Sequence, residues 1–563
     1  MPPVEVTLTD PDALTVETTA GTWLVAGLAP SALRAAVEAA DDGSEVRRRL
    51  ESVAEDAVAV GVVDGRLRAY RSVTATRSLY HCRTPNGTVI LTDHFRTALA
   101  RLPVDGRSVP DRTVADHLLF RTPIEPDAYV AEIETVPRGA WLDWTDDGPT
   151  VDQRGRLDVE PVLTADAAVD AIDDALEAVL AAGSRNDQTV MFSGGVDSTL
   201  LGTYLDAPTV SMAIDSPELA FERRYVRDTR ELLTADGHRT VALDETRFLT
   251  WLEGSMDRLG FPSHFSQTAL THALFAADDG RRYVNGEGAD ALFGLTGSKG
   301  ARIAALLRPL LARTPRPLAA GVPGAAGRRL AELHDLARRF DRPTADRGGF
   351  AQRFAFFTDP DVVARMVGDD LVDRRLRAQR AFVADRVATT DAGPATAHLE
   401  LGHLLSFFQH NTVAQWRQLA HAHGASLLAP FKTGRMARCS QSIPADRRYV
   451  QGLSGLGSLD AKYLLKRLLA RRLPSYPTGR KKGSGALPLE RYFDDGPLAD
   501  VFDRYEPPSV VPEGMLSDHV DSFGPVTWNL ITYAVWRDRV LRNPDLEPVP
   551  ATVDYRDAVE TSP

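Results

Sequence analysis

Hydrophobic and polar residues alternate in short runs over the first 155 residues, a pattern that predicts a β-rich domain with a few helices. Turn sequences such as Val63-Asp64-Gly65 and Pro85-Asn86-Gly87 separate these runs. Residues 156–163 are expected to form a linker. The predicted strands are Val4–Leu8, Thr22–Ala26, Ala57–Val63, Thr88–Thr92 and Ala140–Trp144.

The hydrophobic period changes after the linker. Apolar residues at helical spacing between Val169 and Leu180 predict a helix that Thr164 caps. Strands and helices then alternate, which predicts a doubly wound parallel sheet with its ligands at the carboxyl ends of the strands. The predicted elements are the strands Gln188–Phe192, Thr209–Ile214, His238–Leu243 and Arg282–Asn285 and the helices Glu218–Thr234 and Ser266–Ala277.

The rest of the chain is predicted to be mainly helical, from about residue 330 to a last helix at Val526–Leu541. Residues 307–328 are rich in Pro, Arg, Gly and Ala and are expected to be a mobile surface connection. Residues 549–563 are expected to be a disordered tail. The pattern therefore divides the chain into an α+β domain over 1–155 and an α/β domain with a helical C-terminal part over 164–548.

Composition narrows the class of protein. The length of 563 residues fits two domains, and a net charge of −12 argues against a broad nucleic-acid-binding surface. The two cysteines, Cys82 and Cys439, are too few for a disulfide framework or a Cys-rich zinc site. There is no signal-peptide core and no apolar run of about 18 residues. We therefore expect a cytoplasmic protein with no membrane span and no nucleic-acid partner.

The most specific motif lies at 190–200, where an apolar strand runs into Ser193-Gly194-Gly195-Val196-Asp197-Ser198. Glycines let the backbone approach a ligand, and the start of a helix offers N–H groups to an anion. Asp197 can hold a metal that offsets phosphate charge. No Lys follows the glycines, so this is not the ordinary P-loop. The motif resembles the pyrophosphate loop of enzymes that split ATP into AMP and pyrophosphate, which implies ATP and Mg²⁺ as cofactors.

A second motif spans 285–294 and follows the fourth predicted strand of the sheet. Gly286 and Gly288 bracket Glu287, and Asp290 begins the next turn. A carboxylate delivered by a separate strand end suits a Mg²⁺-pyrophosphate site shared with Asp197. Glu287 can orient or deprotonate an incoming amine.

Lysine is scarce, and its placement is therefore informative. Only six residues are Lys, and four of them fall between 462 and 482. A cation in this window would stabilise the negative charge that develops during adenylation or acyl transfer. Lys482 is the candidate for this role.

Together these motifs resemble the asparagine synthetase family, and the resemblance covers most of the chain. It extends to Lys462-Tyr463-Leu464-Leu465-Lys466, to Arg480-Lys481-Lys482-Gly483 and to the helix around Trp528–Trp536. The family usually has Glu after the metal-binding Asp, where this chain has Ala291. The resemblance implies a homodimer and the following roles: Ser193, Gly194, Gly195, Asp197 and Ser198 at the ATP phosphates and Mg²⁺, Asn285 and Gly286 at the adenosine, Glu287 at the acyl-adenylate, Asp290 at Mg²⁺ and pyrophosphate, and Lys482 at the phosphates or the tetrahedral intermediate.

The N-terminal domain resembles the family's glutaminase domain, which implies an Ntn-like β-sandwich. The traces are Asn86-Gly87, Leu91–Leu99 and Thr135-Val136-Pro137-Arg138-Gly139. That domain uses the thiolate of a Cys that follows the initiator Met, with the free α-amine as base. This chain has Pro2 there, and its first cysteine is Cys82, in a predicted strand region. We therefore expect no glutaminase activity.

These observations favour an ATP-dependent carboxylate–amine ligase. Ammonia as the nucleophile would make it an asparagine synthetase, and an amine of the substrate itself would make it a specialised cyclase such as a lasso-peptide cyclase. β-Lactam synthetases carry Tyr where this chain has Glu287, so that subtype is disfavoured. A nucleotide-thiolating enzyme would need more cysteines and a basic face. A non-catalytic ATP-binding regulator is the alternative outside the enzymes, although Ser193, Asp197, Glu287, Asp290 and Lys482 are all retained.

Overall fold

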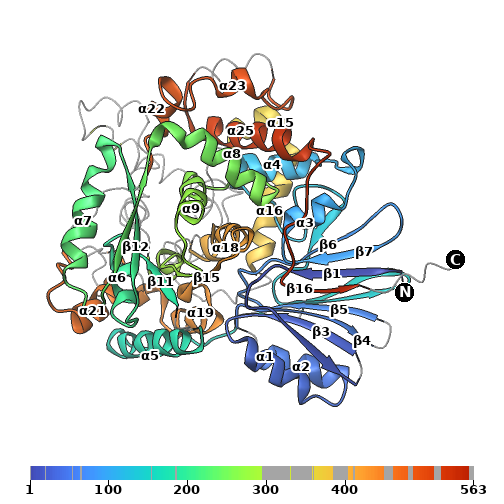
Figure 1. The fold of residues 1–563 in the computed structure, drawn as a ribbon, viewed down its shortest axis with the longest axis horizontal. Helices are drawn as coiled ribbons and strands as arrows, with labels where there is room; N and C mark the ends of the chain where they lie inside the picture. Colours follow the sequence, from blue (N-terminus) through green and yellow to red (C-terminus); the bar gives the residue numbers. More distant parts are fainter. Residues whose placement is uncertain are drawn as a thin grey trace.

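The computed structural model describes most of the chain up to residue 294 and several later segments (Figure 1). The described ranges are 2–19, 21–53, 55–63, 66–153, 155–183, 187–294, 360–384, 403–409, 412–448, 461–479, 486–512 and 522–556, with the single residues 327, 330 and 358. The predicted surface connection at 307–328 lies almost wholly outside these ranges. No helix within them has the length and apolar character needed to cross a membrane.

Two sheets face each other in the N-terminal domain (Figure 1). Alternate residues of their strands, such as Val6, Leu24 and Val60, are buried in one apolar layer between the sheets. The five-stranded sheet has the order β16 (Val553–Arg556), β1 (Val4–Leu8), β7 (Val89–Thr92), β6 (Tyr80–Arg83) and β8 (Ile133–Thr135). The six-stranded sheet has the order β10 (Gly148–Gln153), β9 (Ala140–Thr145), β5 (Arg66–Arg71), β4 (Val58–Val63), β3 (Gly21–Ala26) and β2 (Leu14–Thr18).

Helices cover the outer faces of this sandwich. Helices α1 (Pro30–Glu38) and α2 (Gly43–Val53) pack on the six-stranded sheet around Trp23 and Trp141. Helices α3 (Phe95–Ala100) and α4 (Asp111–Phe120) lie beyond the five-stranded sheet, where Ile90 faces away from the sandwich layer. The domain therefore has the layer order helix, sheet, sheet, helix.

The C-terminal segment differs from the predicted disordered tail. Residues Val553–Arg556 form β16, which pairs antiparallel with β1 at the sheet edge. Val553 and Tyr555 pack against the sandwich layer, while the residues between and after them are exposed. This alternation covers only four residues, too few to stand out in the sequence. Residues 557–563 lie outside the described part of the chain.

The second domain contains the predicted parallel sheet. Its described strands run in the order β13 (His238–Leu243), β12 (Thr209–Ile214), β11 (Gln188–Met191), β14 (Arg282–Val284) and β15 (Ser426–Leu428), and all neighbours are parallel. The chain passes from β11 outward to β13 and then returns to β14 on the other side of β11. The carboxyl ends of β11 and β14 therefore meet at the switch point of the sheet, where open α/β sheets bind ligands.

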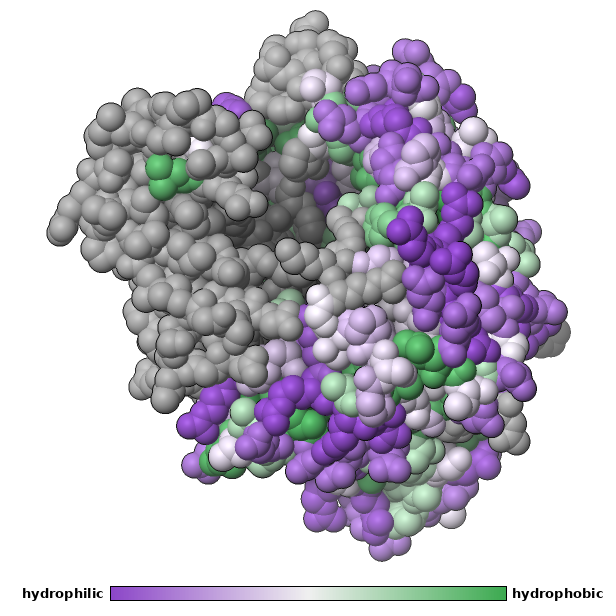
Figure 2. Space-filling view, turned by 90° about the vertical axis from the view of Figure 1, so that its left-hand side faces the viewer, coloured by the Kyte–Doolittle hydropathy of each residue, from purple (hydrophilic) through white to green (hydrophobic). Residues whose placement is uncertain are grey.

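Helices lie on both faces of this sheet, with α7 (Ala220–Arg230) on one side and α9 (Ser266–Ala277) and α18 (Thr412–Ala422) on the other (Figure 1). The predicted cap of α5 (Ala165–Gly183) is present, because the Thr164 hydroxyl accepts a hydrogen bond from the N–H of Ala167. On the face beside α7 and α21 (Tyr463–Arg472), the described residues are mainly hydrophilic (Figure 2). The helices described in this domain are α5 (Ala165–Gly183), α6 (Val196–Gly202), α7 (Ala220–Arg230), α8 (Phe248–Leu259), α9 (Ser266–Ala277), α10 (Ala289–Phe293), α15 (Pro360–Val367), α16 (Asp369–Ala384), α18 (Thr412–Ala422), α19 (Gly434–Gln441), α20 (Ala445–Arg448), α21 (Tyr463–Arg472), α22 (Leu489–Asp494), α23 (Val501–Arg504) and α25 (Pro525–Trp536), the last running on to Leu541.

A buried network of charges joins the two domains. Arg417 of α18 lies 2.7 Å from the Asp56 carboxylate and hydrogen-bonds the Thr76 hydroxyl of the N-terminal domain. Arg77 bridges Asp56, at 2.9 Å, and Asp10, at 2.7 Å. All four charged side chains are buried. Each buried charge has lost its hydration and is compensated by its partners in the network. Removal of one partner would leave charge uncompensated in the domain interface, so the network stabilises the contact between the domains.

Removal of Arg417 should destabilise the protein. In Arg417→Met, the Asp56 carboxylate loses one of two cationic partners inside the interface, and we expect the free energy of unfolding to fall by about 3 kcal/mol. Urea denaturation measures this loss. Arg504→Met, which removes an exposed i,i+4 pair with Asp500, should leave the transition unchanged. Equal stability of the two variants would show that the network does not hold the interface.

Candidate active site

The turn after β11 is closed by its own hydroxyl groups. The strand ends at Met191, and α6 begins at Val196. Between them, the N–H of Ser193 donates to the Ser198 hydroxyl at 3.2 Å, and the two Ser hydroxyls lie 3.3 Å apart. The six residues from Ser193 to Ser198 thus fold back on themselves at the carboxyl end of the central strand.

Two other segments support this turn from behind. The carbonyl of Gly194 accepts hydrogen bonds from the Tyr476 hydroxyl at 3.2 Å and from the Thr229 hydroxyl at 3.4 Å. Thr229 belongs to α7, and Tyr476 follows α21. The turn is therefore supported by helix α7 and by the segment that follows α21.

The second motif lies directly against the first. A Cβ atom added to Gly286 would stand 2.9 Å from the Asp197 Cβ and 3.4 Å from the Ser198 N atom. No L side chain fits at that distance without moving one of the two turns. Glycine at 286 is what allows the ends of β11 and β14 to touch. Beside it, the Asn285 side chain accepts a hydrogen bond from the N–H of Glu287 at 2.6 Å.

A lysine joins the carboxylates of the two motifs. The Lys462 ammonium lies 2.5 Å from Asp197 Oδ2 and 3.0 Å from Asp290 Oδ1. Burial disfavours its charge, but the two carboxylates outweigh this and raise the pKa of Lys462 above its ordinary value. Lys462 has a φ of +58°, which is unfavourable for a non-glycine residue, and the two ion pairs hold it there.

Helix α21 holds this lysine in place. Lys462 immediately precedes Tyr463, the first residue of the helix, and the apolar side of the helix, including Leu464 and Leu468, is fully buried. On its outer side, Arg471 pairs with Asp170 of α5 at 2.5 Å. The buried leucines supply most of the stability here, because exposed ion pairs contribute little.

The carboxylates fit a divalent cation. Asp197 Oδ1 is buried and accepts no hydrogen bond from the described residues, so one oxygen is left for a ligand. No cluster of three or more metal-binding side chains occurs within the described ranges. Mg²⁺ needs no such cluster, since it commonly binds through one or two carboxylates and completes its shell with water and phosphate oxygens. Asp197 and Asp290 are therefore the residues that would hold it.

Glu287 lies beside this group of charges. Burial raises the pKa of its carboxyl group, Asp290 raises it further, and the two lysines at 432 and 462 act in the opposite direction. Burial also lowers the pKa of Lys432, to about 7, while Glu287 opposes that shift. A carboxylate and an amine whose pKa values are moved toward each other are typical of proton-transfer sites.

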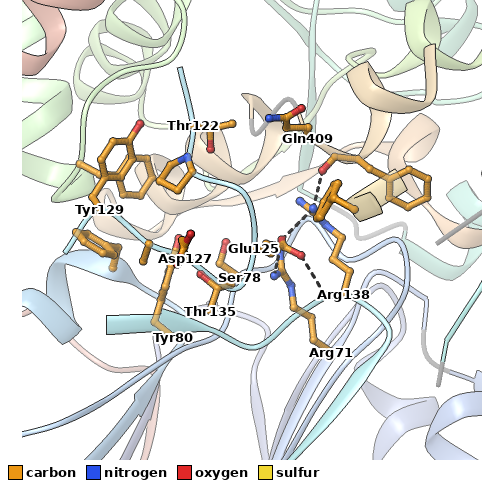
Figure 3. A pocket seen from close by; sticks show the side chains of 16 residues that line it. Arg71, Ser78, Tyr80, Thr122, Glu125, Asp127, Tyr129, Thr135, Arg138 and Gln409 are labelled. Atoms are coloured by element: carbon orange, nitrogen blue, oxygen red, sulfur yellow. Dashed lines mark hydrogen bonds and ion pairs between the residues drawn. The ribbon is translucent and has the colours of Figure 1, made fainter. Parts of the chain in front are cut away.

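A cavity lies elsewhere, between the N-terminal domain and the helical part of the second domain (Figure 3). Glu125 lines this cavity and forms ion pairs with Arg71 and Arg138, each at 2.9 Å. Tyr129 and Gln409 line other sides. The described lining of this cavity includes none of the residues predicted to bind ATP.

The structure places most of the predicted site residues together at the switch point. These are Ser193, Gly194, Gly195, Asp197, Ser198, Asn285, Gly286, Glu287 and Asp290. Lys482 lies outside the described residues, so its predicted role stays a prediction. The sequence did not single out Lys462 or Lys432. Lysine scarcity was the available signal for Lys462. The sequence carried no comparable signal for Lys432, because only the structure shows that its Pro-Phe turn is buried.

Substitution of Gly286 should damage nucleotide binding without unfolding the domain. In Gly286→Ala, the new methyl group collides with Asp197, and overpacking of this kind typically costs ~1–3 kcal/mol, so affinity for Mg-ATP should fall about tenfold or more. Isothermal titration measures the change. Gly524→Ala is the matched control, because its Cβ would meet only the Thr527 hydroxyl at 3.9 Å. Wild-type affinity in Gly286→Ala would contradict the assigned contact.

A comparison with protein-family models identifies the family of the chain. Residues 169–518 match the family model described as Asparagine synthase, which is more than half of the chain and includes both turns and Lys462. The comparison with curated proteins gave no match. The chain belongs to the asparagine synthase family.

Proposed function

We propose that this protein is an ATP-dependent ligase that joins a carboxylate to an amine through an acyl-adenylate, with release of pyrophosphate and then AMP. One observation carries the proposal: carboxylates from two adjacent strand ends, Asp197 and Asp290, converge on one lysine beside a turn built from Ser193 and Ser198. Membership of the asparagine synthase family supports the same chemistry.

The first step is adenylation. A carboxylate oxygen of the substrate attacks the α-phosphorus of ATP, and the bond to the oxygen that bridges to the β-phosphate breaks. The hydroxyls of Ser193 and Ser198 and the N–H groups of their turn bind the phosphates. Asp197 and Asp290 would hold Mg²⁺, which offsets phosphate charge when bound. Lys482, from the Arg-Lys-Lys-Gly motif, would meet the negative charge that develops.

The second step is amide formation. An amine nitrogen attacks the acyl carbon, its proton passes to Glu287, and the bond between the acyl carbon and the AMP oxygen breaks. Burial and neighbouring Asp290 raise the pKa of Glu287, which makes it a stronger base than an exposed carboxylate.

We infer that the N-terminal domain, an Ntn-like sandwich, does not hydrolyse glutamine. The thiol of Cys82 is buried in β6, and burial raises its pKa to about 12. Burial also raises the pKa of Cys439 to about 12. Neither thiol is available as the thiolate that attacks an amide. The amine is then either free ammonia or, as we favour, a group of the substrate itself.

Loss of either metal carboxylate should abolish turnover. We expect Asp197→Asn and Asp290→Asn each to abolish Mg²⁺-dependent pyrophosphate release and to weaken binding of Mg-α,β-methylene-ATP more than tenfold in isothermal titration. Binding in EDTA should change far less, because the lost interaction is with the metal. Asp166→Asn, at an exposed ion pair on α5, is the control and should behave as wild type. Unaltered Mg-nucleotide affinity in both site variants would refute the metal assignment.

The protein should release no glutamate from glutamine. The reason is that burial raises the pKa of both thiols and so disfavours the thiolate. Coupled glutamate dehydrogenase detects the product, and Cys82→Ser should show the same background rate as wild type. A robust rate that disappears in Cys82→Ser would overturn this account of the N-terminal domain.

A further inference from the structure

We propose that Lys432 is a positioning residue for Glu287, and that the N-terminal domain helps to place it through Arg138. This inference deepens the proposed function and rests on it for its meaning. Its evidence is a continuous set of contacts that runs from the domain interface to the turn at 286–288.

The stem of Lys432 packs directly on that turn. Gly288 has a φ of +100°, and a Cβ atom there would stand 2.9 Å from Lys432 Cγ, 3.2 Å from Cδ and 3.3 Å from Cε. The lysine side chain therefore fills the space that any other residue at 288 would occupy. A side chain at 288 would therefore displace Lys432, so the glycine next to Glu287 leaves the room that the lysine stem takes up.

The head of Lys432 is fixed at the end of a helical segment, 403–408. Its ammonium donates to the carbonyl of Phe407 at 2.7 Å and lies 3.4 Å from that of Ser406, and it stands 4.6 Å from the centre of the Phe407 ring. Carbonyls at the C-terminal end of a helix and an aromatic face both attract a cation. These contacts hold the ammonium in a site where Lys432 is only 4% exposed.

The N-terminal domain binds the next carbonyl of the same segment. Arg138, which follows β8, donates to the carbonyl of Phe408 at 2.5 Å and pairs with Glu125 (Figure 3). Arg138 is buried. A cation from each domain thus binds the same helix end. Movement of Arg138 would therefore shift the carbonyls that hold the Lys432 ammonium.

Two charged groups act on Lys432 from the elements packed around it. Glu287, from the turn after β14, favours its charged form, and Arg138, from the N-terminal domain, disfavours it. Their effects on the pKa of Lys432 have opposite signs, so replacement of each residue should move that pKa in a different direction. In the reaction, the Lys432 side chain would keep the Glu287 carboxylate directed at the acyl-adenylate rather than toward Asp290.

The test uses the full-length protein and does not require a known substrate. With only six lysines, selective ¹³Cε-lysine labelling gives few NMR signals, and the signal that is missing in Lys432→Met belongs to Lys432. Should that variant not fold, the signal that is missing in Lys432→Arg identifies it. Titration with pH then follows this signal. We expect the pKa of Lys432 to fall by about one unit in Glu287→Gln and to rise in Arg138→Met.

Arg107→Met is the matched control. Arg107 is another buried cation that binds carbonyls near a helix end, those of Leu541 at 3.0 Å and Asn543 at 2.8 Å, and it should leave the Lys432 signal unchanged. No shift in Glu287→Gln would overturn the electrostatic coupling of Lys432 to Glu287, and no shift in Arg138→Met would overturn the contribution of the N-terminal domain.

A second readout separates this inference from the proposed function. Lys432→Met should leave the affinity for Mg-α,β-methylene-ATP within about twofold of wild type, since Lys432 contacts the turn and not the phosphate-binding hydroxyls. Loss of nucleotide affinity in Lys432→Met would contradict the positioning role. Absence of nucleotide binding in the wild type would instead refute the proposed function, while the NMR test of the coupling between Lys432 and Glu287 still stands.

Discussion

Everything in the site depends on the close approach of two strand ends. The carboxyl ends of β11 and β14 are neighbours because the chain reverses its direction of travel across the sheet at that point. Gly286 lets the two turns touch, and Lys462 neutralises the carboxylates that this contact brings together. Without the cation, Asp197 and Asp290 would repel each other in a partly buried place, so the geometry of this site depends on its electrostatics.

The N-terminal domain has a structural role that does not require glutamine chemistry. Its Asp56 and Arg77 share a buried charge network with Arg417, and Arg138 binds a helix end close to the active site. The chain also returns to this domain at its C-terminal end, where β16 extends the sheet. The N-terminal domain is thus tied to the rest of the chain at three places.

The sequence predicted the regular elements well where the hydrophobic period was long and unbroken. The strands Val4–Leu8, Thr209–Ile214 and His238–Leu243 and the helix Ser266–Ala277 have the predicted bounds. Short strands such as β15 and β16 were missed, because three or four residues carry too little periodicity. The Lys462–Asp197 pair spans 265 residues, and only the folded sheet shows that the two meet. Lys432 was missed because it looks like an ordinary polar residue after a turn.

The central claim is that the turn at 193–198 binds the phosphates of ATP for cleavage between the α- and β-phosphorus atoms. A crystal structure with Mg-α,β-methylene-ATP tests it most directly, since the analogue cannot release pyrophosphate. The account predicts the terminal phosphates within hydrogen-bond distance of Ser193 and Ser198, and a Mg²⁺ ion bound by Asp197 and Asp290. A nucleotide bound elsewhere, such as in the cavity between the domains, or a metal held without either aspartate, would contradict it.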